Sequence, residues 1–341
     1  MNEKVDLTII IVSWNVKDLL KSCLESIAKA QGSLNLEVFV VDNASTDGTA
    51  EELENDAKLP ASTSQDSSWR GGRKTCETSE NAKSNLNIKI ILNKENLGFA
   101  KANNQAIRKA NGEFILLLNP DMKLFPDTLI NIVDWMKQNP QAKIAGCHLV
   151  DKRGQTVSHV RQFPTITDQL AIILKLPHIF PNILNKYLRK NFDYTRAQKV
   201  DSVRGSFFMI RSNLNESETP ASRLQKGEDS SPHTVGGDCH PRLLDERYFL
   251  WFEEVDFCRQ VQQGKGEVWY TPSAKAIDHV GRSFKQLPRG KTQKYFMSSQ
   301  LKYFQKWHPK PQYLLLKLAW PLGLAIAWMG EKLNLKSKTK T

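Results

Sequence analysis

The first 140 residues alternate between short apolar runs and segments with helical spacing, and this pattern limits the fold more than any other feature of the sequence. The apolar runs are rich in Val, Ile and Leu and show no alternation with polar residues. Such runs are typical of strands buried on both faces of a parallel sheet. They predict four strands, over Leu7–Val12, Leu36–Val41, Ile88–Leu92 and Phe114–Leu118.

A segment with helical spacing follows each predicted strand. In the first of them, Leu20, Leu24 and Ile27 fall on one face of a helix. Strands that alternate with helices at this spacing indicate an α/β fold with a doubly wound, mostly parallel sheet and helices on both faces. The predicted helices are Val16–Ala30, a short helix from Thr49 through Leu53, Ala100–Ala110 and Leu129–Gln138.

Length and composition limit the class of protein. The chain has 341 residues, of which 40% are hydrophobic, so it can bury a real core and is not largely disordered. Its 48 Lys and Arg against 36 Asp and Glu give a net charge of +12, which suits nucleic acid, anionic lipid or phosphorylated substrates alike. Five scattered cysteines without a Cys-x-x-Cys pair favour a reduced cytoplasmic setting and no zinc site.

Two stretches interrupt the alternating pattern. Residues 58–87 and 213–242 are rich in Ser, Thr and Gly and lack periodicity, so we expect disordered surface insertions there. We expect one α/β domain over residues 5–285 that contains both insertions. A helical, membrane-associated tail is expected over residues 286–341.

Polar residues follow three of the four predicted strands, as Ser13-Trp14-Asn15, Asp42-Asn43-Ala44-Ser45 and Asn119-Pro120-Asp121. Ligands of open α/β sheets bind beyond the carboxyl ends of the strands. There Asp42 can accept hydrogen bonds from a base or ribose, and Asp121 can ligate Mg²⁺ or Mn²⁺. Each set alone is explained by turn formation or helix capping. Three sets at one sheet edge favour a binding site.

Seven segments, taken in order, resemble the family 2 glycosyltransferases with a GT-A fold, and most closely their rhamnosyltransferase-like branch. The resemblance runs from about Val40 to Ser283. No single segment is decisive, but the ordered set is specific. The segments are VVDNASTDGT, NKENLGFAKANNQAI, FILLLNPDM, VRQFPT, VRGSFFMIR, LDERYFLWFEEVDFCRQ and AIDHVGRS.

The resemblance implies a role for each matching residue. Asp42 matches the acid that hydrogen-bonds the nucleotide base, and Asp121 matches the last acid of the metal-binding Asp-x-Asp motif. Asn119 stands where that motif has its first Asp, which leaves Asp121 as the one carboxylate of that motif for a divalent metal, Mg²⁺ or Mn²⁺. His279 matches a His that faces the metal and the diphosphate. The remaining expected contacts with the nucleotide sugar are Ser13, Asn15, Asn43, Asn96, Gly98, Asn104 and Asn119.

The acidic cluster Glu253-Glu254-Val255-Asp256 follows the aromatic run Tyr248–Phe252. Acids in the first turn of a helix are favoured by its dipole, so the cluster has an explanation without catalysis. Carboxylates beside apolar surface, however, have raised pKa values, which suits a general base. The resemblance implies a base at Glu254, and we rank Glu254 first and Asp256 second.

The expected reaction is an inverting transfer of a sugar, with rhamnose as the best guess. The donor is a nucleotide diphosphate sugar, and the acceptor is a saccharide or lipid-linked hydroxyl in cell-surface polysaccharide synthesis. Residues 165–199 are expected to cover the acceptor side. A nucleotidyltransferase or an inactive nucleotide-sugar-binding relative are the alternatives. A nucleic-acid-binding protein is suggested by charge alone, and no such partner is expected.

Tyr313–Met329 is apolar apart from Lys317. About seventeen residues is the lower limit for a membrane-spanning helix. Three interpretations remain open: a helix packed on the catalytic domain, an interfacial helix and a membrane span. Interfacial attachment is favoured, because Trp320 and Trp328 suit the headgroup region and acceptors of this family are often lipid-linked. We therefore expect a cytoplasmic protein at the inner face of the cell membrane.

Overall fold

The computed structural model describes residues 4–58, 86–212, 243–279 and 289–338. Both predicted insertions, apart from their edges, lie outside these ranges, as does the end of the AIDHVGRS segment. Lys58 ends a helix and Asn87 begins a strand, so the first insertion is bounded by regular structure on both sides. The division into residues 5–285 and 286–341 stays a prediction.

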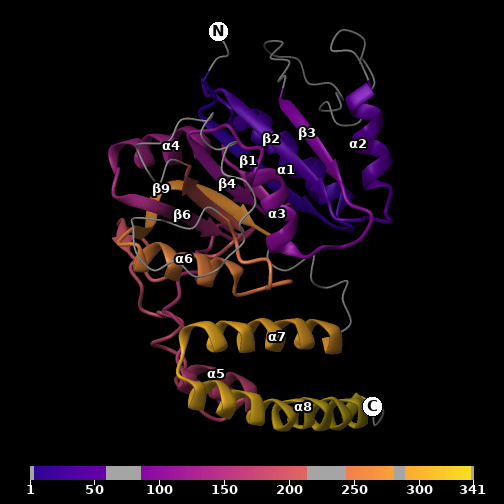
Figure 1. The fold of residues 1–341 in the computed structure, drawn as a ribbon, viewed down its shortest axis with the longest axis vertical. Coiled ribbons are helices and arrows are strands. Elements are labelled where there is room, and N and C mark those ends of the chain that lie inside the picture. The colour runs from indigo at the N-terminus through magenta and orange to yellow at the C-terminus, as the bar shows by residue number, and fades with distance from the viewer. Residues whose placement is uncertain (1–3, 59–85, 213–242, 280–288, 339–341) are drawn as a thin grey trace.

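One mixed sheet forms the centre of the molecule (Figure 1). Its strands lie in the order β3-β2-β1-β4-β8-β6-β9-β5, and β7 pairs with β9. β1, β2, β3 and β4 are parallel neighbours, whereas β8 runs antiparallel between β4 and β6. The strands are β1 Leu7–Ser13, β2 Leu36–Asp42, β3 Asn87–Leu92, β4 Phe114–Leu118, β5 Met122–Leu124, β6 Ala142–Val150, β7 Gln198–Lys199, β8 Phe207–Arg211 and β9 Glu267–Asp278.

Helices cover both faces of the sheet. One apolar core packs α1 and α4 against one face, and a second packs α3 and α6 against the other. The doubly wound, mostly parallel sheet expected from the sequence is thereby confirmed. These helices are α1 Lys17–Ala30, α2 Thr49–Lys58, α3 Phe99–Ile107, α4 Thr128–Gln138 and α6 Glu253–Gln263.

The four strands expected from apolar runs are all present, within one residue at each end. The helix expected over Ala100–Ala110 ends earlier, at Ile107, and the helix expected through Leu53 continues to Lys58. Burial explains why three of these strands were readable: every residue of β2 and β4 is buried, and β1 is buried except for Val12. β3 lies at the edge of the sheet and none of its residues is fully buried.

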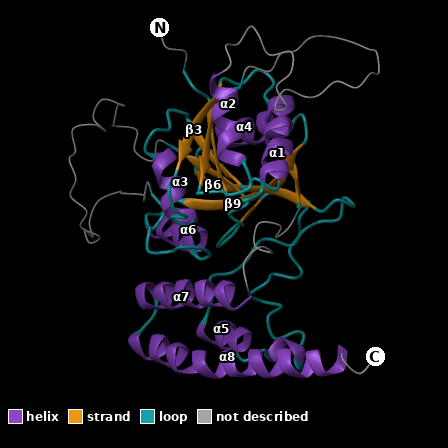
Figure 2. Cartoon of the chain, turned by 90° about the vertical axis from the view of Figure 1, so that its right-hand side faces the viewer, coloured by secondary structure: helices purple, strands orange, loops and turns teal. Residues whose placement is uncertain are grey.

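A separate helical layer lies beyond the end of the sheet that is far from the N-terminus (Figure 2). It contains α5 (Ile166–Ile173), α7 (Arg289–Trp307) and α8 (Lys310–Lys338), with α8 packed against both α5 and α7. A short 3-10 helix, Leu176–His178, follows α5. The layer has its own apolar core, which also takes in Tyr248 and Phe252 from the segment before α6. This core joins the helical layer to the catalytic candidates on α6.

α8 has two different faces. Leu316 is fully buried, and a Cβ added at Gly323 would lie 2.5 Å from Ile173 Cγ2, so this face meets α5 closely. Trp320 packs toward the same core, which contradicts its expected place as a headgroup anchor. The side chain of Trp328 lies outside the described part of the chain. Four leucines are exposed on the other face: Leu314, Leu315, Leu318 and Leu322. Among the described residues, no helix is long and apolar enough to cross a membrane.

Candidate active site

The ends of β1 and β2 form a buried polar wall. Ser13 and Asp42 lie opposite each other in register, and the Asn43 amide donates to the Ser13 carbonyl at 2.8 Å. Both side chains are almost fully buried. One Asp42 oxygen accepts from the Ser45 amide at 3.0 Å. The other oxygen and the Ser13 hydroxyl have no hydrogen-bond partner within the described chain, so both can bind a ligand.

Asn15 ties the two loops that follow these strands. Its backbone has a φ of 52°, a left-handed conformation that Asn tolerates better than most residues. The backbone N–H of Asn15 donates to Ser45 Oγ at 2.9 Å. The side-chain oxygen of Asn15 accepts from the backbone N–H of Thr46 at 2.6 Å. Asn15 therefore fixes the shape of the wall; its expected contact with the nucleotide stays a prediction.

Asn43 and Asn96 form the next part of the wall. Asn43 Nδ2 donates to Asn96 Oδ1 at 2.9 Å, and Asn43 Oδ1 accepts from the Leu97 amide at 3.0 Å. Gly98 follows with a φ of 82°. A Cβ on Gly98 would lie 2.5 Å from the Phe249 carbonyl oxygen, so only glycine fits here. The Asn-x-Gly-Phe segment is thus pressed against the aromatic run before α6.

Asn104 is fully buried and holds α3 to the segment that precedes the aromatic run. Its side chain donates to the Leu244 carbonyl at 2.8 Å and to Glu246 Oε1 at 3.0 Å, and it accepts from the Leu244 amide at 3.0 Å. These three hydrogen bonds give the side-chain amide of Asn104 a structural role. Its expected contact with the ribose stays a prediction that this geometry does not favour.

The segment 119–121 lies between β4 and the short strand β5. The Asn119 amide donates to the Ser206 carbonyl at 2.9 Å, which fixes the loop on β8. Because β5 pairs antiparallel with the end of β9, the His279 amide reaches the Asp121 carbonyl at 3.2 Å. The structure therefore brings together the two residues that the sequence proposed as metal ligands, although they are far apart in the chain.

The residues around Asp121 suit a metal ion that arrives with a diphosphate. Among the described residues, no group of three or more His, Cys, Asp or Glu side chains is placed to hold a metal. Asp121, however, is 4% exposed, and Mg²⁺ and Mn²⁺ are commonly held by one or two carboxylates together with substrate phosphates. One buried carboxylate beside His279 fits such a site and does not fit an all-protein cage.

Arg204 and Asp278 are site residues that the sequence analysis missed. Arg204 Nη1 lies 3.1 Å from Asp278 Oδ2, which also accepts from Ser206 Oγ at 3.3 Å. Asp278 is 3% exposed and directly precedes His279. The signal was present in the VRGSFFMIR and AIDHVGRS segments, but nothing in either one shows that they pair.

Glu253 and Glu254 occupy the first turn of α6. Burial raises the pKa of Glu254, and the charge of Arg204 opposes that rise. Burial also raises the pKa of Glu253 well above its usual value, and the neighbouring Glu254 charge adds to the shift. Gly205 lies against Glu254, because a Cβ added there would be 3.5 Å from Glu254 Cβ. Arg204 is thus the group that connects Glu254 with the Asp278–His279 strand end.

The turn that enters α6 is strained. Trp251 and Phe252 have φ values of 65° and 70°, a conformation that bulky residues rarely adopt. Each such residue costs of order 1–3 kcal/mol and persists where the surrounding structure enforces it. Phe252 is buried in the core of the helical layer, which supplies that enforcement. The strained turn sets the direction in which Glu253 and Glu254 leave the aromatic run.

Asp256 lies one turn further along α6 and bonds to the helical layer. It is fully buried and accepts hydrogen bonds from Lys306 Nζ at 2.8 Å and Trp307 Nε1 at 2.6 Å, both on α7. Gln260 and Tyr248 also donate to it, at 2.6 and 3.3 Å. With four donors, Asp256 joins α6 to α7. Its place as the second candidate base stays a prediction that this geometry does not favour.

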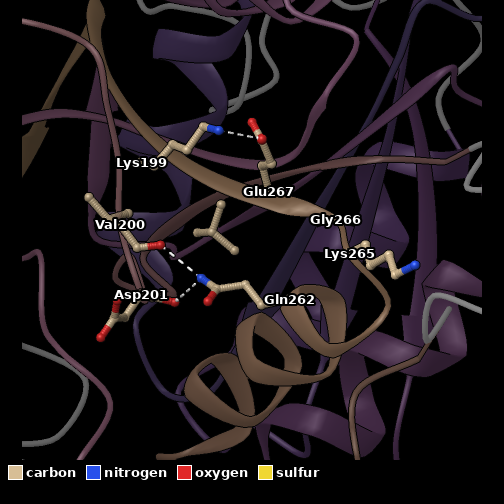
Figure 3. Close-up of a pocket in the computed structure, with 8 residues that line it drawn as sticks. Lys199, Val200, Asp201, Gln262, Lys265, Gly266 and Glu267 are labelled. Carbon is tan, nitrogen blue, oxygen red and sulfur yellow. Dashed lines mark hydrogen bonds and ion pairs between the residues drawn. The ribbon is translucent and has the colours of Figure 1, made fainter.

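A shallow cavity of about 300 Å³ lies elsewhere, between β7, the end of α6 and the start of β9 (Figure 3). Its lining carries the Lys199–Glu267 ion pair and Gln262, which donates to the Val200 and Asp201 carbonyls at 2.9 and 3.2 Å. None of the candidate site residues lines it. Through these two hydrogen bonds Gln262 fixes the backbone a few residues before Arg204.

Comparisons with known proteins find a matching family and several relatives. A model of glycosyl transferase family 2 matches residues 8–217. The rhamnosyltransferase WbbL of Escherichia coli K12 is 25% identical over 198 residues, which cover 55% of this chain and 64% of that protein. An N-acetylglucosaminyl-diphospho-decaprenol L-rhamnosyltransferase of Mycobacterium tuberculosis is 22% identical over 208 residues, which cover 58% of this chain and 60% of that protein. The chain thus spans less than two thirds of either relative.

Solved structures show similar folds at low identity. The mannosyltransferase PcManGT from Pyrobaculum calidifontis, in complex with GDP-Man and Mn²⁺, aligns with a TM-score of 0.49 and 17% identity, over 95% of this chain and 74% of that one. TarS 1-349 of S. aureus with UDP-GlcNAc aligns with a TM-score of 0.47 and 14% identity, over 92% and 70% of the two chains. Both scores fall below 0.5, so the assignment rests on the sequence family. The family model covers more than half of the chain, and the protein belongs to glycosyl transferase family 2.

Proposed function

We propose that this protein transfers a sugar from a nucleotide diphosphate donor to an acceptor hydroxyl, with inversion at the anomeric carbon. One observation carries the proposal. Arg204 pairs with Asp278 at the strand end that holds His279 beside Asp121, and its charge also acts on Glu254. A diphosphate-binding edge and a buried carboxylate with a raised pKa are thereby joined through one side chain.

The proposed reaction is a single displacement. Glu254 takes the proton of the acceptor hydroxyl as that oxygen forms a bond to the anomeric carbon, and the bond from this carbon to the donor diphosphate breaks. The nucleotide diphosphate leaves with the electron pair. General base catalysis contributes roughly a hundred- to ten-thousand-fold to such a step. Attack opposite the leaving group inverts the anomeric configuration.

Asp42, with Ser13 and Asn43, would bind the nucleoside, and Asp121 with His279 would hold a divalent metal ion. Such an ion neutralises charge that grows on a departing diphosphate. Arg204 adds a second positive charge on the same side. Asp278 fixes the Arg204 guanidinium in place, since a charge-assisted bond of this kind limits its rotation.

The names of the relatives support a class of donor and a class of acceptor. Two relatives are named as rhamnosyltransferases, and one acts on an N-acetylglucosaminyl-diphospho-decaprenol acceptor. We infer a deoxyhexose of the rhamnose type as the donor sugar and a lipid-linked saccharide as the acceptor, in cell-surface polysaccharide synthesis. Protection against thermal unfolding by a panel of dTDP-, UDP- and GDP-sugars identifies the donor, because a bound ligand stabilises the fold by mass action.

The decisive variant is Glu254→Gln. It should bind the protecting donor as tightly as wild type and transfer at least about 100-fold more slowly. Asp134→Asn on α4 is a matched control, because Asp134 is exposed. Transfer at the wild-type rate by Glu254→Gln would refute Glu254 as the base. Loss of donor protection in that variant would show that it acts in binding.

We further propose that α8 attaches the protein to an anionic lipid surface, which places it at the inner face of the cell membrane. At 100° per residue, the four exposed leucines of α8 fall within one arc of the helix, opposite its packed face. Leu318 is 76% exposed, and Lys310 and Lys317 are exposed on the same helix. An apolar stripe flanked by Lys is typical of interfacial helices.

Vesicle flotation tests this attachment. Leu315→Ser combined with Leu318→Ser should abolish binding to vesicles that contain phosphatidylglycerol, and Leu92→Ser should not, because Leu92 is an exposed leucine on β3. Wild type should bind neutral phosphatidylcholine vesicles more weakly. If wild type does not float, this proposal is wrong. If wild type forms a dimer that the double variant abolishes, the leucine stripe binds a second copy of the chain and the proposal is also wrong.

A further inference from the structure

The segment that follows α5 exposes a second group of apolar side chains, separate from the leucines of α8. Ile179, Phe180 and Ile183 are 70%, 58% and 43% exposed. They lie within six consecutive exposed residues, 178–183, of a longer segment, 176–192, which we call the α5 loop. Single exposed apolar residues need no explanation, but a contiguous group of them is typical of an interaction surface.

The α5 loop is held in a defined shape. The backbone N–H of Phe180 donates to the Leu176 carbonyl at 2.8 Å, which forms a tight turn at the apolar group. Leu184 turns inward and is 8% exposed. The backbone N–H of Gln162 donates to the Tyr187 carbonyl at 3.0 Å, so the second half of the loop is fixed on the segment before α5. The structure therefore presents the exposed side chains from an ordered support.

The charge of the α5 loop has one sign. Residues 169–192 include no Asp or Glu, and they carry four cationic side chains: Lys175, Lys186, Arg189 and Lys190. Lys186 and Lys190 are exposed. In the described part of the chain, the next ion pair along the sequence joins Arg196 to Asp193, beyond the loop. The exposed cations thus stand beside the apolar group without a local carboxylate, which favours an anionic partner.

The combination of charge and apolar surface selects the kind of partner. Cations alone suit any polyanion, but the exposed Ile and Phe side chains stay in water unless the partner also offers an apolar interior. A bilayer with anionic headgroups has both properties. α8 shows the same pattern, because residues 310–330 also lack Asp and Glu and include Lys310 and Lys317 beside the exposed leucines.

The α5 loop starts where α5 meets α8. α5 lies beside α8 in both views (Figures 1 and 2). A Cβ added at Gly323 would lie 2.9 Å from the Ile173 carbonyl oxygen, and the loop begins three residues later, at Leu176. The two apolar surfaces therefore belong to neighbouring parts of the helical layer.

We propose that the α5 loop is a second lipid-binding element. Ile179, Phe180 and Ile183 enter the headgroup boundary of an anionic bilayer, and Lys186 and Lys190 bind lipid phosphates. α8 and the loop then contact one bilayer at two places, which fixes how the protein is rotated on the surface; one helix alone leaves it free to rock about the helix axis. This inference extends the attachment proposed for α8 and does not depend on sugar transfer.

Cosedimentation with vesicles tests the apolar contact. The vesicles contain phosphatidylglycerol and phosphatidylcholine, and the partition coefficient of the full chain is measured. Ile179→Ser combined with Phe180→Ser should lower it about 10- to 100-fold, because two large apolar side chains no longer leave water on binding. Ile88→Ser combined with Leu92→Ser is the matched control: both residues are 39% exposed, on β3, and the partition coefficient should stay at the wild-type value.

A charge variant tests the anionic partner separately. Lys186→Gln combined with Lys190→Gln should lower the partition coefficient about 10- to 30-fold on vesicles with phosphatidylglycerol, and should not change it on pure phosphatidylcholine. Lys4→Gln combined with Lys137→Gln is the control. These lysines pair with Glu113 and Asp6 near the N-terminus, at the end of the sheet far from the helical layer.

The outcomes separate this proposal from the one for α8. All the substituted loop side chains are exposed, so the unfolding temperatures should stay at the wild-type value, which separates lost binding from lost folding. Wild-type partitioning of both loop variants would overturn the proposal. A dimer that Ile179→Ser with Phe180→Ser abolishes would also overturn it, because a second copy then covers the loop. If only the loop variants lose binding and Leu315→Ser with Leu318→Ser keeps it, the proposal for α8 fails and this one stands.

Discussion

The proposed donor edge and the proposed acceptor side of this site are built in different ways. At the donor edge, Ser13 and Asp42 end β1 and β2, and Asp121 lies in the loop after β4, so the ends of parallel strands bring them to one edge. On the acceptor side, Glu254 comes from a strained helix start, and Arg204, from a loop, links it to the donor edge. The order of parallel strands is enough to assemble the residues of a sheet edge. The acceptor side is assembled only by contacts between segments that are far apart in the sequence.

The largest expected effect tests the donor edge. Asp121→Ala should reduce both donor hydrolysis and transfer by at least about 100-fold, because it removes the buried carboxylate that would hold the metal and, through it, the diphosphate. Rates measured across a Mn²⁺ titration check this, with Asp134→Ala as the control on the exposed face of α4. Wild-type turnover in Asp121→Ala would show that Asp121 does not hold the diphosphate, and the donor edge would then have no assigned metal ligand of its own.

A second prediction concerns what holds the acceptor side together. Asp256→Asn should lower the free energy of unfolding by about 3–5 kcal/mol, because it breaks a buried ion pair with Lys306. Urea unfolding measures this loss. Glu254→Gln serves as the contrast, since it should lose transfer and keep stability. If Asp256→Asn stayed stable and lost transfer, Asp256 would be the base and the assignment on α6 would be reversed.

A smaller effect is expected at the contact between Gly98, on the donor edge, and Phe249, in the aromatic run before α6. Gly98→Ala should cost about 1–3 kcal/mol of stability and raise the KM for the donor, because the new methyl group meets the Phe249 carbonyl at a positive φ. Gly154→Ala is a matched control: Gly154 has a φ of 77°, but no heavy atom lies within 4 Å of an added Cβ. Equal losses in both variants would show that backbone strain alone matters and that Gly98 does not join the halves.

The smallest effect is a pH dependence of stability on the acceptor side. Burial, with Arg204 and Arg161 adding to it, lowers the pKa of His159 from 6.5 to about 3. The unfolded chain therefore binds this proton first, and the free energy of unfolding falls as the pH drops below 6.5 towards 3. Over the tested interval from pH 6.5 to 5 the loss is about 1–2 kcal/mol, because the slope approaches about 1.4 kcal/mol per pH unit only below the unfolded pKa. His159→Gln should remove this share of the slope, and an unchanged slope between pH 6.5 and 5 would contradict it.

The sequence by itself determined the strands and their polar ends. Buried strands such as Leu36–Asp42 are mostly apolar, with Glu37 as one exception inside the strand, so their identity needs no knowledge of their neighbours. Their ends then identify Asp42 and Asp121, because parallel strands place these residues at one sheet edge. The acidic cluster at Glu253-Glu254 was recognisable for a different reason, because it directly follows the aromatic run Tyr248–Phe252.

Only the tertiary structure decided what surrounds these residues. Arg204 with Asp278, and Asp256 with Lys306, are joined across 74 and 50 positions of sequence, and no local pattern indicates such partners. α8 shows the same limit: between Tyr313 and Met329 it is apolar apart from Lys317, and only packing against α5 shows which leucines stay exposed. Local periodicity reports how a residue sits on its own element. Which charges it meets depends on how distant elements pack.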